Sequence, residues 1–510
     1  MVGGLVVLVA IMAVGLHFVE KHWPYRYRNV EPLLESVLAS KIKIDKYHRT
    51  YFPHPGFVAT GLTLQRNSAP NLPPIGTAKN LIVQGRWIDL LLLRNRIQLV
   101  DVVGLHVVIP PVGSQANQED FPAGSSADFA GPTTAVQQFH LHNAELDIQR
   151  VHGGQYAFPI RELRIGNFKR GQAISYVVDM QNARPTGRIQ SKGSFGPLTP
   201  KDLGGTKLSG DFTFAPVNLG DVGSISGTLA AKGHFSGTLA SIAAEASTNT
   251  PDFAVNHGRP TVVAGDVKST VNGLNGNVVL NSIDIKTGAT VVHVEGSILG
   301  ATDTPKVTNL DITVSRGRVQ DVLRPFLKGK VPVTGALSLH SHARIDAARG
   351  GAKFLQRLRM DGEFSVPAEK LTNVANEKKL SGLSQRAQGI KAPKGDAEDA
   401  ANADADVVSS LNGAVSVRDG VLSTQQLTFA IPGATVNLNG TFNFRNSNVH
   451  LVGNLAMESD ISHVTTGFKS VLLKPLAPFF KKKPAGAVIP IAVTGGPGHY
   501  TVTQDLLHQK

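Results

Sequence analysis

The feature that most constrains this chain is an alternation of apolar and polar side chains that returns along much of its 510 residues. The clearest stretch runs from 434 to 444, where threonine and asparagine separate the apolar positions. The apolar residues that share one face of this stretch are Ala434, Val436, Leu438, Phe442 and Phe444. A period of two is that of a β-strand with one buried face. The pattern therefore predicts a mainly β protein.

Similar runs recur at 310–315, 337–345 and 449–457, and turn pairs such as Asp419-Gly420 and Pro432-Gly433 separate the runs. Pairs of this kind connect adjacent antiparallel strands. The high content of Gly (52) and Pro (29) agrees with many tight turns. We therefore expect a long antiparallel meander with a few short helices.

A sheet with one apolar face has to cover that face, and this sequence offers few amphipathic helices for the purpose. Three arrangements remain open: packing on a second sheet, closing into a barrel, or rolling so that the apolar side lines a groove. A groove would accept acyl chains. Its candidate lining residues are Val436, Leu438, Phe442 and Phe444.

The first residues predict a transmembrane helix at 1–20. No charged side chain occurs from Met1 to Leu16, and the apolar run continues through Val19. About 18–20 apolar residues cross a bilayer core as a helix. A cleaved signal peptide is the alternative, but no small-x-small cleavage site follows the run. Lys21, Arg26 and Arg28 follow the span, and the positive-inside rule alone would keep the body in the cytoplasm.

The formal net charge of +13 would favour an anionic partner, either nucleic acid or anionic lipid headgroups, although scattered charges also suit an ordinary solvated surface. The apolar N-terminus favours the membrane over nucleic acid. The clearest basic cluster, Lys481, Lys482 and Lys483, follows Phe479 and Phe480. This combination suits a membrane interface, and equally a loop with a buried Phe pair.

The motifs of common enzymes are missing: the sequence has no nucleophile elbow, Walker A loop, dinucleotide fingerprint or H-E-x-x-H. It has no cysteine, which excludes disulfides and thiolate sites. Two pairs, His140/His142 and His340/His342, would each share one face of a strand and could bind a metal. Both sit opposite the apolar rows, which favours surface histidines. We expect no enzyme, no catalytic residue, no cofactor and no metal.

Several stretches resemble the AsmA family, and they occur in the same order. In the N-terminal part they are Phe52–Phe57, Gly61–Leu64, Ile75–Leu81, Trp87–Leu91 and Val108–Pro111. In the middle part they are Asn182–Gly187, Gly193–Pro197, Ser226–Leu229, Gly233–Leu239 and Thr250–Phe253. In the C-terminal part, the most specific match, they are Leu383–Gly389, Leu411–Gly413, Pro432–Ala434, Leu472–Lys481 and Ile489–Gly495.

This resemblance implies an inner-membrane anchor with the body in the bacterial periplasm, and kinship with TamB-like and chorein-like proteins whose taco-like rolled sheets carry lipids along an apolar groove. The expected function is a lipid-binding or lipid-transfer protein that supports phospholipid transport and outer-membrane homeostasis. The alternative is a non-enzymatic assembly factor that contacts outer-membrane proteins through exposed strand edges.

The expected organisation has a helical or disordered insert, because residues 391–406 are mostly Ala, Asp, Lys and Gly. From start to end, the segments are a transmembrane anchor (1–20), an N-terminal AsmA-like β region (21–200), a middle β repeat region (201–372), the insert (373–410) and an AsmA-like C-terminal domain (411–510).

Overall fold

The structure is a computed structural model. It describes residues 25–28, 30–32, 41–66, 72–92, 94, 96–111, 114–116, 135–149, 154–168, 171–197, 202–222, 225–301, 305–347, 352–372, 377, 380–381, 384–385, 387–388, 407–458, 488–496 and 499–504. The described part is mainly β, as the alternation predicts. It divides into two compact units, unit 1 with Met1–Asp221 and Lys232–Ile242, and unit 2 with Val222–Ala231 and Ala243–Lys510.

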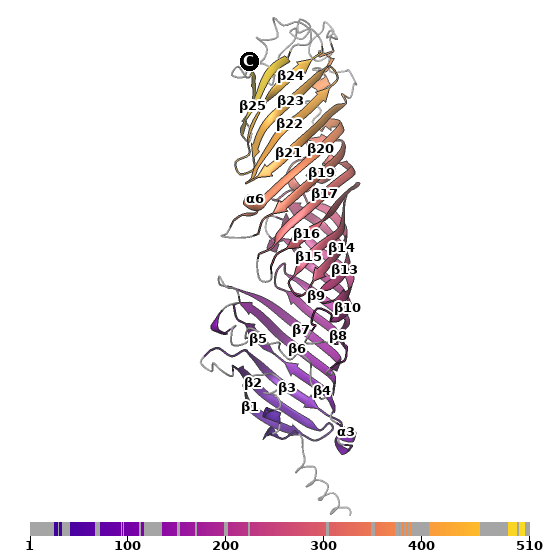
Figure 1. Cartoon of the computed structure of the whole chain (residues 1–510), viewed down its shortest axis with the longest axis vertical. Coiled ribbons are helices and arrows are strands. Elements are labelled where there is room, and N and C mark those ends of the chain that lie inside the picture. Colours follow the sequence, from indigo (N-terminus) through magenta and orange to yellow (C-terminus); the bar gives the residue numbers. More distant parts are fainter. Residues whose placement is uncertain are drawn as a thin grey trace, which may run out of the picture. The chain divides into compact units, whose positions relative to one another are not determined.

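Unit 1 is built largely from paired strands, and the short helix α3 (Trp87–Leu91) follows β3 (Figure 1). Its strands are β1 (Lys41–Thr50), β2 (Gly56–Gln65), β3 (Gly76–Gln84), β4 (Arg96–Val103), β5 (His106–Ile109), β6 (Ala135–Gln149), β7 (Gln155–Phe168), β8 (Ile174–Asn182), β9 (Gly187–Phe195) and β10 (Lys207–Asn218). The 3-10 turn η1 (Leu219–Val222) follows β10, and the division between the units passes through η1, β12 (Thr228–Thr238) and β13 (Ser241–Val255).

One element of unit 1 corrects the expected antiparallel meander. β6 runs parallel to β4 and to β5, with Val100 beside Phe139 and Val107 beside Leu146. Parallel neighbours need a long crossover instead of a two-residue hairpin. The segment 110–134 between β5 and β6 provides that length, and it contains the Gly/Ser/Ala-rich stretch 113–132, most of which lies outside the described residues. The sheet is therefore mixed.

Unit 2 continues with strands whose given registers are all antiparallel. Its strands are β11 (Ile225–Ser226), β14 (Thr261–Asn272), β15 (Asn277–Thr287), β16 (Thr290–Leu299), β17 (Val307–Arg318), β18 (Val333–Thr334), β19 (Ala336–Ile345), β20 (Leu358–Leu371), β21 (Ser409–Arg418), β22 (Val421–Ile431), β23 (Ala434–Asn443), β24 (Asn448–Met457), β25 (Val488–Gly496) and β26 (His499–Gln504) (Figure 1). Its short helices are α5 (Val319–Leu323), η2 (Arg324–Phe326) and α6 (Phe354–Arg357).

The expected turn chemistry is confirmed at β21–β22 and β22–β23. Asp419 (φ 51°) and Gly420 (φ 75°) both adopt left-handed backbone, the conformation of a two-residue hairpin whose twist matches the strands. At the next turn, Gly433 has φ 86°, which a side chain would strain. These turns set the register that places Phe429 opposite Val436.

Three clusters of buried apolar side chains form cores within the two units. In unit 1, Tyr25, Phe57 and Leu81 belong to a core under β1 to β3. In unit 2, one cluster joins strands to α5 and contains Val314, Val319, Leu337 and Val366. Another packs the short helical stretch around Ala387 onto β22 to β25. Each cluster is small and lies where a helix or chain segment covers part of the sheet.

The predicted transmembrane helix at 1–20 lies outside the described residues. Among the residues that the structure does describe, none belongs to a helix with the length and hydropathy needed to cross a bilayer.

The cluster beneath α5 leads to a test of packing. Val314 is 1% exposed, and Val314→Ala is expected to lower the free energy of unfolding by about 2 kcal/mol, because it removes two buried methyl groups and leaves a cavity. Val177→Ala is the matched control, since Val177 is 51% exposed and its loss should be below about 1 kcal/mol. Urea unfolding followed by circular dichroism measures both. Equal losses would contradict the assigned packing.

Candidate functional site

A continuous apolar surface lies on one face of β6 to β10 in unit 1. Leu141 pairs with Leu163, and Leu163 pairs with Val178. Directly paired residues project from the same face of a sheet, so these side chains form one row. The other members of this surface, the unit 1 face, are Phe139, Ile165, Tyr176, Met180, Ile189, Phe195, Leu208, Phe212 and Phe214.

Most of the unit 1 face is only half-buried. Of the described apolar side chains in β7 to β10, Val217 alone is fully buried. Val178, Ile189 and Phe212, in the middle of the face, are all intermediate in exposure. A sheet packed on a second layer would contain rows of fully buried residues. Among the described residues, no helix of unit 1 belongs to a core cluster on this face.

Aromatic rings cover the backbone where this face lacks side chains. Gly193 pairs with Gly210, and both positions belong to the apolar row of Tyr176. A Cβ on Gly210 would lie 2.8 Å from the Tyr176 hydroxyl oxygen and 3.0 Å from Phe235 Cζ. Phe235 also lies near Phe212, with ring centroids 6.4 Å apart. Glycine leaves the space that these rings occupy, which keeps the surface apolar and low in relief.

The opposite face of the same strands is charged. Val177 pairs with Arg164 and Lys192, and its neighbour Asp179 on this face accepts two hydrogen bonds from Arg188, at 2.6 and 2.9 Å. The Arg188 guanidinium holds the pKa of Asp179 below its usual value. Charge on one side and hydrocarbon on the other establish which face meets water.

Unit 2 carries a corresponding surface, the unit 2 face. One of its rows is Leu310, Ala343, Met360, Val417, Leu422, Phe442 and Val449. A second is Val314, Leu339, Phe364, Gly413, Leu427, Leu438, Gly453 and Ile491. A third is Val366, Leu411, Phe429, Val436, Leu455 and Ile489. α5 and the stretch around Ala387 cover part of this face.

The structure places three of the four candidate lining residues on the unit 2 face. Val436 and Leu438 are half-buried and pack against the cluster around Ala387. Phe442 is half-buried and lies outside the three clusters. Phe444 follows the end of β23 and is 43% exposed, with its ring edge-on to Phe442 at 5.2 Å between centroids. The candidate membrane-interface residues, Phe479, Phe480, Lys481, Lys482 and Lys483, lie outside the described residues.

The outward face of unit 2 carries rows of acids and bases. His293 Nδ1 lies 2.8 Å from Asp284 Oδ1, and its Nε2 lies 3.1 Å from Glu295 Oε1. These carboxylates, Asp284 first, raise the pKa of His293 above its ordinary value of 6.5. On the same face, Arg418 of β21 donates to Asp361 of β20 at 2.7 Å and lowers the pKa of that carboxyl.

The two histidine pairs differ in how exposed they are to solvent. His340 and His342 are exposed, and His342 Nδ1 lies 2.8 Å from Asp311 Oδ1. His140 and His142 are half-buried, with His142 Nε2 3.6 Å from Asp101 Oδ1. Within the described ranges, no three His, Cys, Asp or Glu side chains come together as a metal site.

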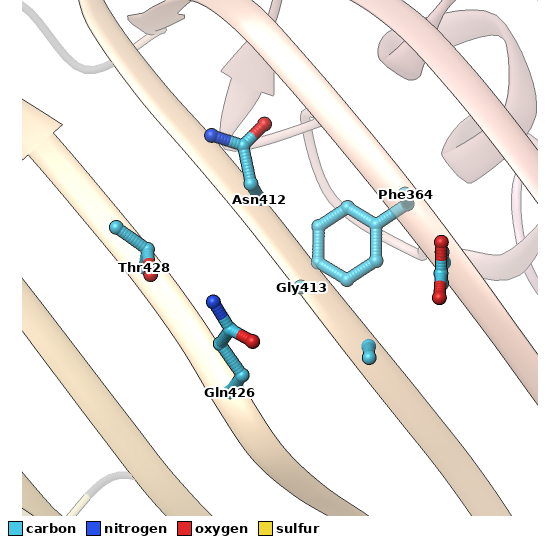
Figure 2. A pocket seen from close by; sticks show the side chains of 7 residues that line it. Phe364, Asn412, Gly413, Gln426 and Thr428 are labelled. Carbon is cyan, nitrogen blue, oxygen red and sulfur yellow. The ribbon is translucent and has the colours of Figure 1, made fainter.

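A small hollow lies across β20, β21 and β22, with a volume of about 260 Å³ (Figure 2). Its lining consists of Glu363, Phe364, Asn412, Gly413, Ala414, Gln426 and Thr428. The lining is mostly polar, and the volume falls below the roughly 300 Å³ at which ligand pockets begin. The hollow is therefore not a candidate for an apolar ligand.

The unit 1 face was missed by sequence reasoning, although a signal for it exists. In β8, Ile174, Tyr176, Val178 and Met180 alternate with outward positions, but Val177 interrupts the pattern. In β9, the inward positions Ser191 and Gly193 are not apolar. Only pairing with neighbouring strands shows that these positions belong to an apolar row.

No protein-family model matches the chain, and no curated protein matches it.

The His293 cluster leads to a test by titration. We expect His293 to titrate above pH 6.5 in the folded protein. Its ion pairs should stabilise the fold fully below pH 6.5, and this stabilisation should be lost as the pH rises through the pKa of the folded state. NMR of the imidazole protons measures the pKa. Asp284→Asn with Glu295→Gln should return it towards the ordinary value. An unshifted titration in the unmodified protein would contradict the cluster.

Proposed function

We propose that this chain is an AsmA-type lipid-handling protein. It binds the acyl chains of phospholipids on the unit 1 and unit 2 faces, and thereby supports phospholipid transport and outer-membrane homeostasis. In this proposal, residues 1–20 anchor it in the bacterial inner membrane, the body lies in the periplasm, and the sheet rolls as in the taco-like proteins that the sequence resembles. The chain is not an enzyme.

One observation carries the proposal: the rows of half-buried apolar side chains on β7 to β10, with charged residues on the other side of the same strands. Contiguous exposed apolar surface on a protein marks a site where a ligand, a membrane or another protein binds. Acyl chains suit this surface because the members named above are hydrocarbon except for the Tyr176 hydroxyl, which lies 3.1 Å from the Ser191 hydroxyl. Ser191 Oγ also donates to the Asp211 carbonyl at 2.9 Å, so both hydroxyls already have partners within the sheet.

The mechanism is passive partitioning. Moving a 16-carbon chain from a bilayer into water costs about 12 kcal/mol, at about 0.8 kcal/mol per CH₂. A continuous apolar surface on the sheet removes most of that cost at each position, so the acyl chain moves along the surface without a driving reaction. Paired strands about 4.8 Å apart offer many equivalent contacts, which keeps binding weak and mobile.

Two adjacent valines on β8 provide a matched test of acyl-chain contact. Val178 lies on the unit 1 face, while Val177 points to the charged face and is 51% exposed. A photocrosslinking amino acid at Val178 should yield lipid adducts in cells, read by mass spectrometry, and the same residue at Val177 should not. In unit 2, Phe442 and Thr441 form a corresponding pair. Adducts at neither inward position would reject lipid binding.

A charged side chain on the unit 1 face should block lipid transfer along it. We expect Val178→Asp to reduce lipid loading at least about tenfold, because a carboxylate on an apolar surface has to keep its water. Val177→Asp adds the same charge on the outward face and should leave loading unchanged. Circular dichroism checks that both variants fold. Equal loading by the two variants would remove the unit 1 face from the path.

The alternative, an assembly factor for outer-membrane proteins, predicts a different result. It requires contact through strand edges and no bound lipid. Copurified barrel precursors without lipid adducts would favour it.

A further inference from the structure

Helix α3 of unit 1 exposes apolar side chains to solvent while its charged residue is buried. Its one charged residue, Asp89, is 5% exposed, whereas Ile88 is 47% and Leu91 71% exposed. Leu92, directly after the helix, is 52% exposed. A surface helix normally buries its apolar stripe and shows its charges to solvent. Trp87 and Leu90 of α3 do pack against the unit 1 core, so Ile88, Leu91 and Leu92 form a second apolar side that stays exposed. Contiguous exposed apolar side chains mark a surface that meets a membrane or a partner.

The loop between β1 and β2 adds a second exposed apolar group at the same end of the sheet. Phe52 is 90% exposed and Tyr51 43%. Gly56, which begins β2, pairs with Gln84 at the end of β3, and the Gly85 amide donates to the Pro55 carbonyl at 2.7 Å. The loop 51–55 therefore adjoins the connection from β3 to α3.

The charges at this end are almost all positive. The exposed basic residues on and beside the two segments are Arg28, Arg49, Arg86, Arg94 and Arg96. The nearby acids are withdrawn: Asp89 is buried, and Glu31 is half-buried and accepts a hydrogen bond from the Tyr27 hydroxyl at 2.9 Å. Arginine beside exposed aromatic and aliphatic side chains suits an anionic lipid surface, where guanidinium groups reach phosphates and the rings lie at headgroup level.

The apolar N-terminal sequence also leads to this end. Residues 1–24 are outside the described ranges, and the first described residue, Tyr25, packs here: its ring centroid lies 6.2 Å from that of Phe57, and its carbonyl accepts from the Tyr47 hydroxyl. The sequence that precedes it has no charged side chain from Met1 to Leu16. A membrane that held this segment would meet the same end of unit 1.

We propose that loop 51–55 and α3 form a membrane-docking surface, which inserts Phe52, Leu91 and Leu92 into the headgroup region of an anionic bilayer while the surrounding arginines bind lipid phosphates. The surface goes beyond acyl-chain binding on the sheet faces. It would hold the unit 1 sheet with one end at the bilayer, whether or not lipid enters that sheet.

The chain has no cysteine, so a single introduced thiol reports one position in the full-length protein. Phe52→Cys and Leu91→Cys, each labelled with the polarity-sensitive fluorophore NBD, are reconstituted in vesicles of phosphatidylcholine and phosphatidylglycerol. Val177→Cys is the control, because it is an exposed apolar position of unit 1 on the charged face of β8. Circular dichroism verifies folding of every variant.

Emission at 52 and 91 should shift to shorter wavelength, and nitroxide lipids labelled near the headgroup should quench it, while the label at 177 keeps its aqueous spectrum. Adding Arg86→Glu and Arg94→Glu should abolish the quenching at both positions. Aqueous, unquenched labels at 52 and 91 would overturn the proposal. So would an apolar shift that depends on protein concentration in the absence of vesicles, which would assign the surface to a second copy. Lipid adducts at Val178 are scored separately, so either proposal can fail alone.

Discussion

The one-sidedness of the paired strands is the constraint on which the rest of the structure depends. Strand register keeps every apolar row on the same face across neighbours, as in the series Leu141, Leu163 and Val178. A slip of one residue would exchange that row for the charged one that holds Val177. Hairpin turns with left-handed backbone, such as Asp419-Gly420, secure the register. Fold and candidate site are therefore consequences of the same pairing.

An apolar face of the sheet forms a buried core where another segment covers it, and remains available to a ligand where none does. α5 lies over Val314 and Leu337, and the short stretch around Ala387 lies over Ile431 and Leu455. These positions are fully buried and supply stability. β7 to β10 have no such cover among the described residues, and of their apolar side chains only Val217 is fully buried. The covered parts of the sheet therefore stabilise the fold, and the uncovered parts provide the proposed binding surface.

Short-range pattern was sufficient for the strands and turns of unit 2. The run from Ala434 to Phe442 forms a strand with the predicted faces, and the few short helices that the sequence predicts include α5 and η2. The parallel placement of β6 was not foreseen, because alternation within a strand carries no information about its neighbour's direction. Val436 and Leu438 also proved to pack on a cluster, since the segment that covers them is distant in sequence.

The sequence by itself determined the secondary structure and which side chains share a face, because both follow from a period of two between residues that are covalent neighbours. It also determined the excess of basic over acidic residues and the apolar character of the first segment. Only the tertiary structure decided which rows remain half-buried and that Phe52, Leu91 and Leu92 remain exposed. Exposure depends on what lies across space from a side chain. That relation is set by strand pairing between distant segments, which local pattern does not encode.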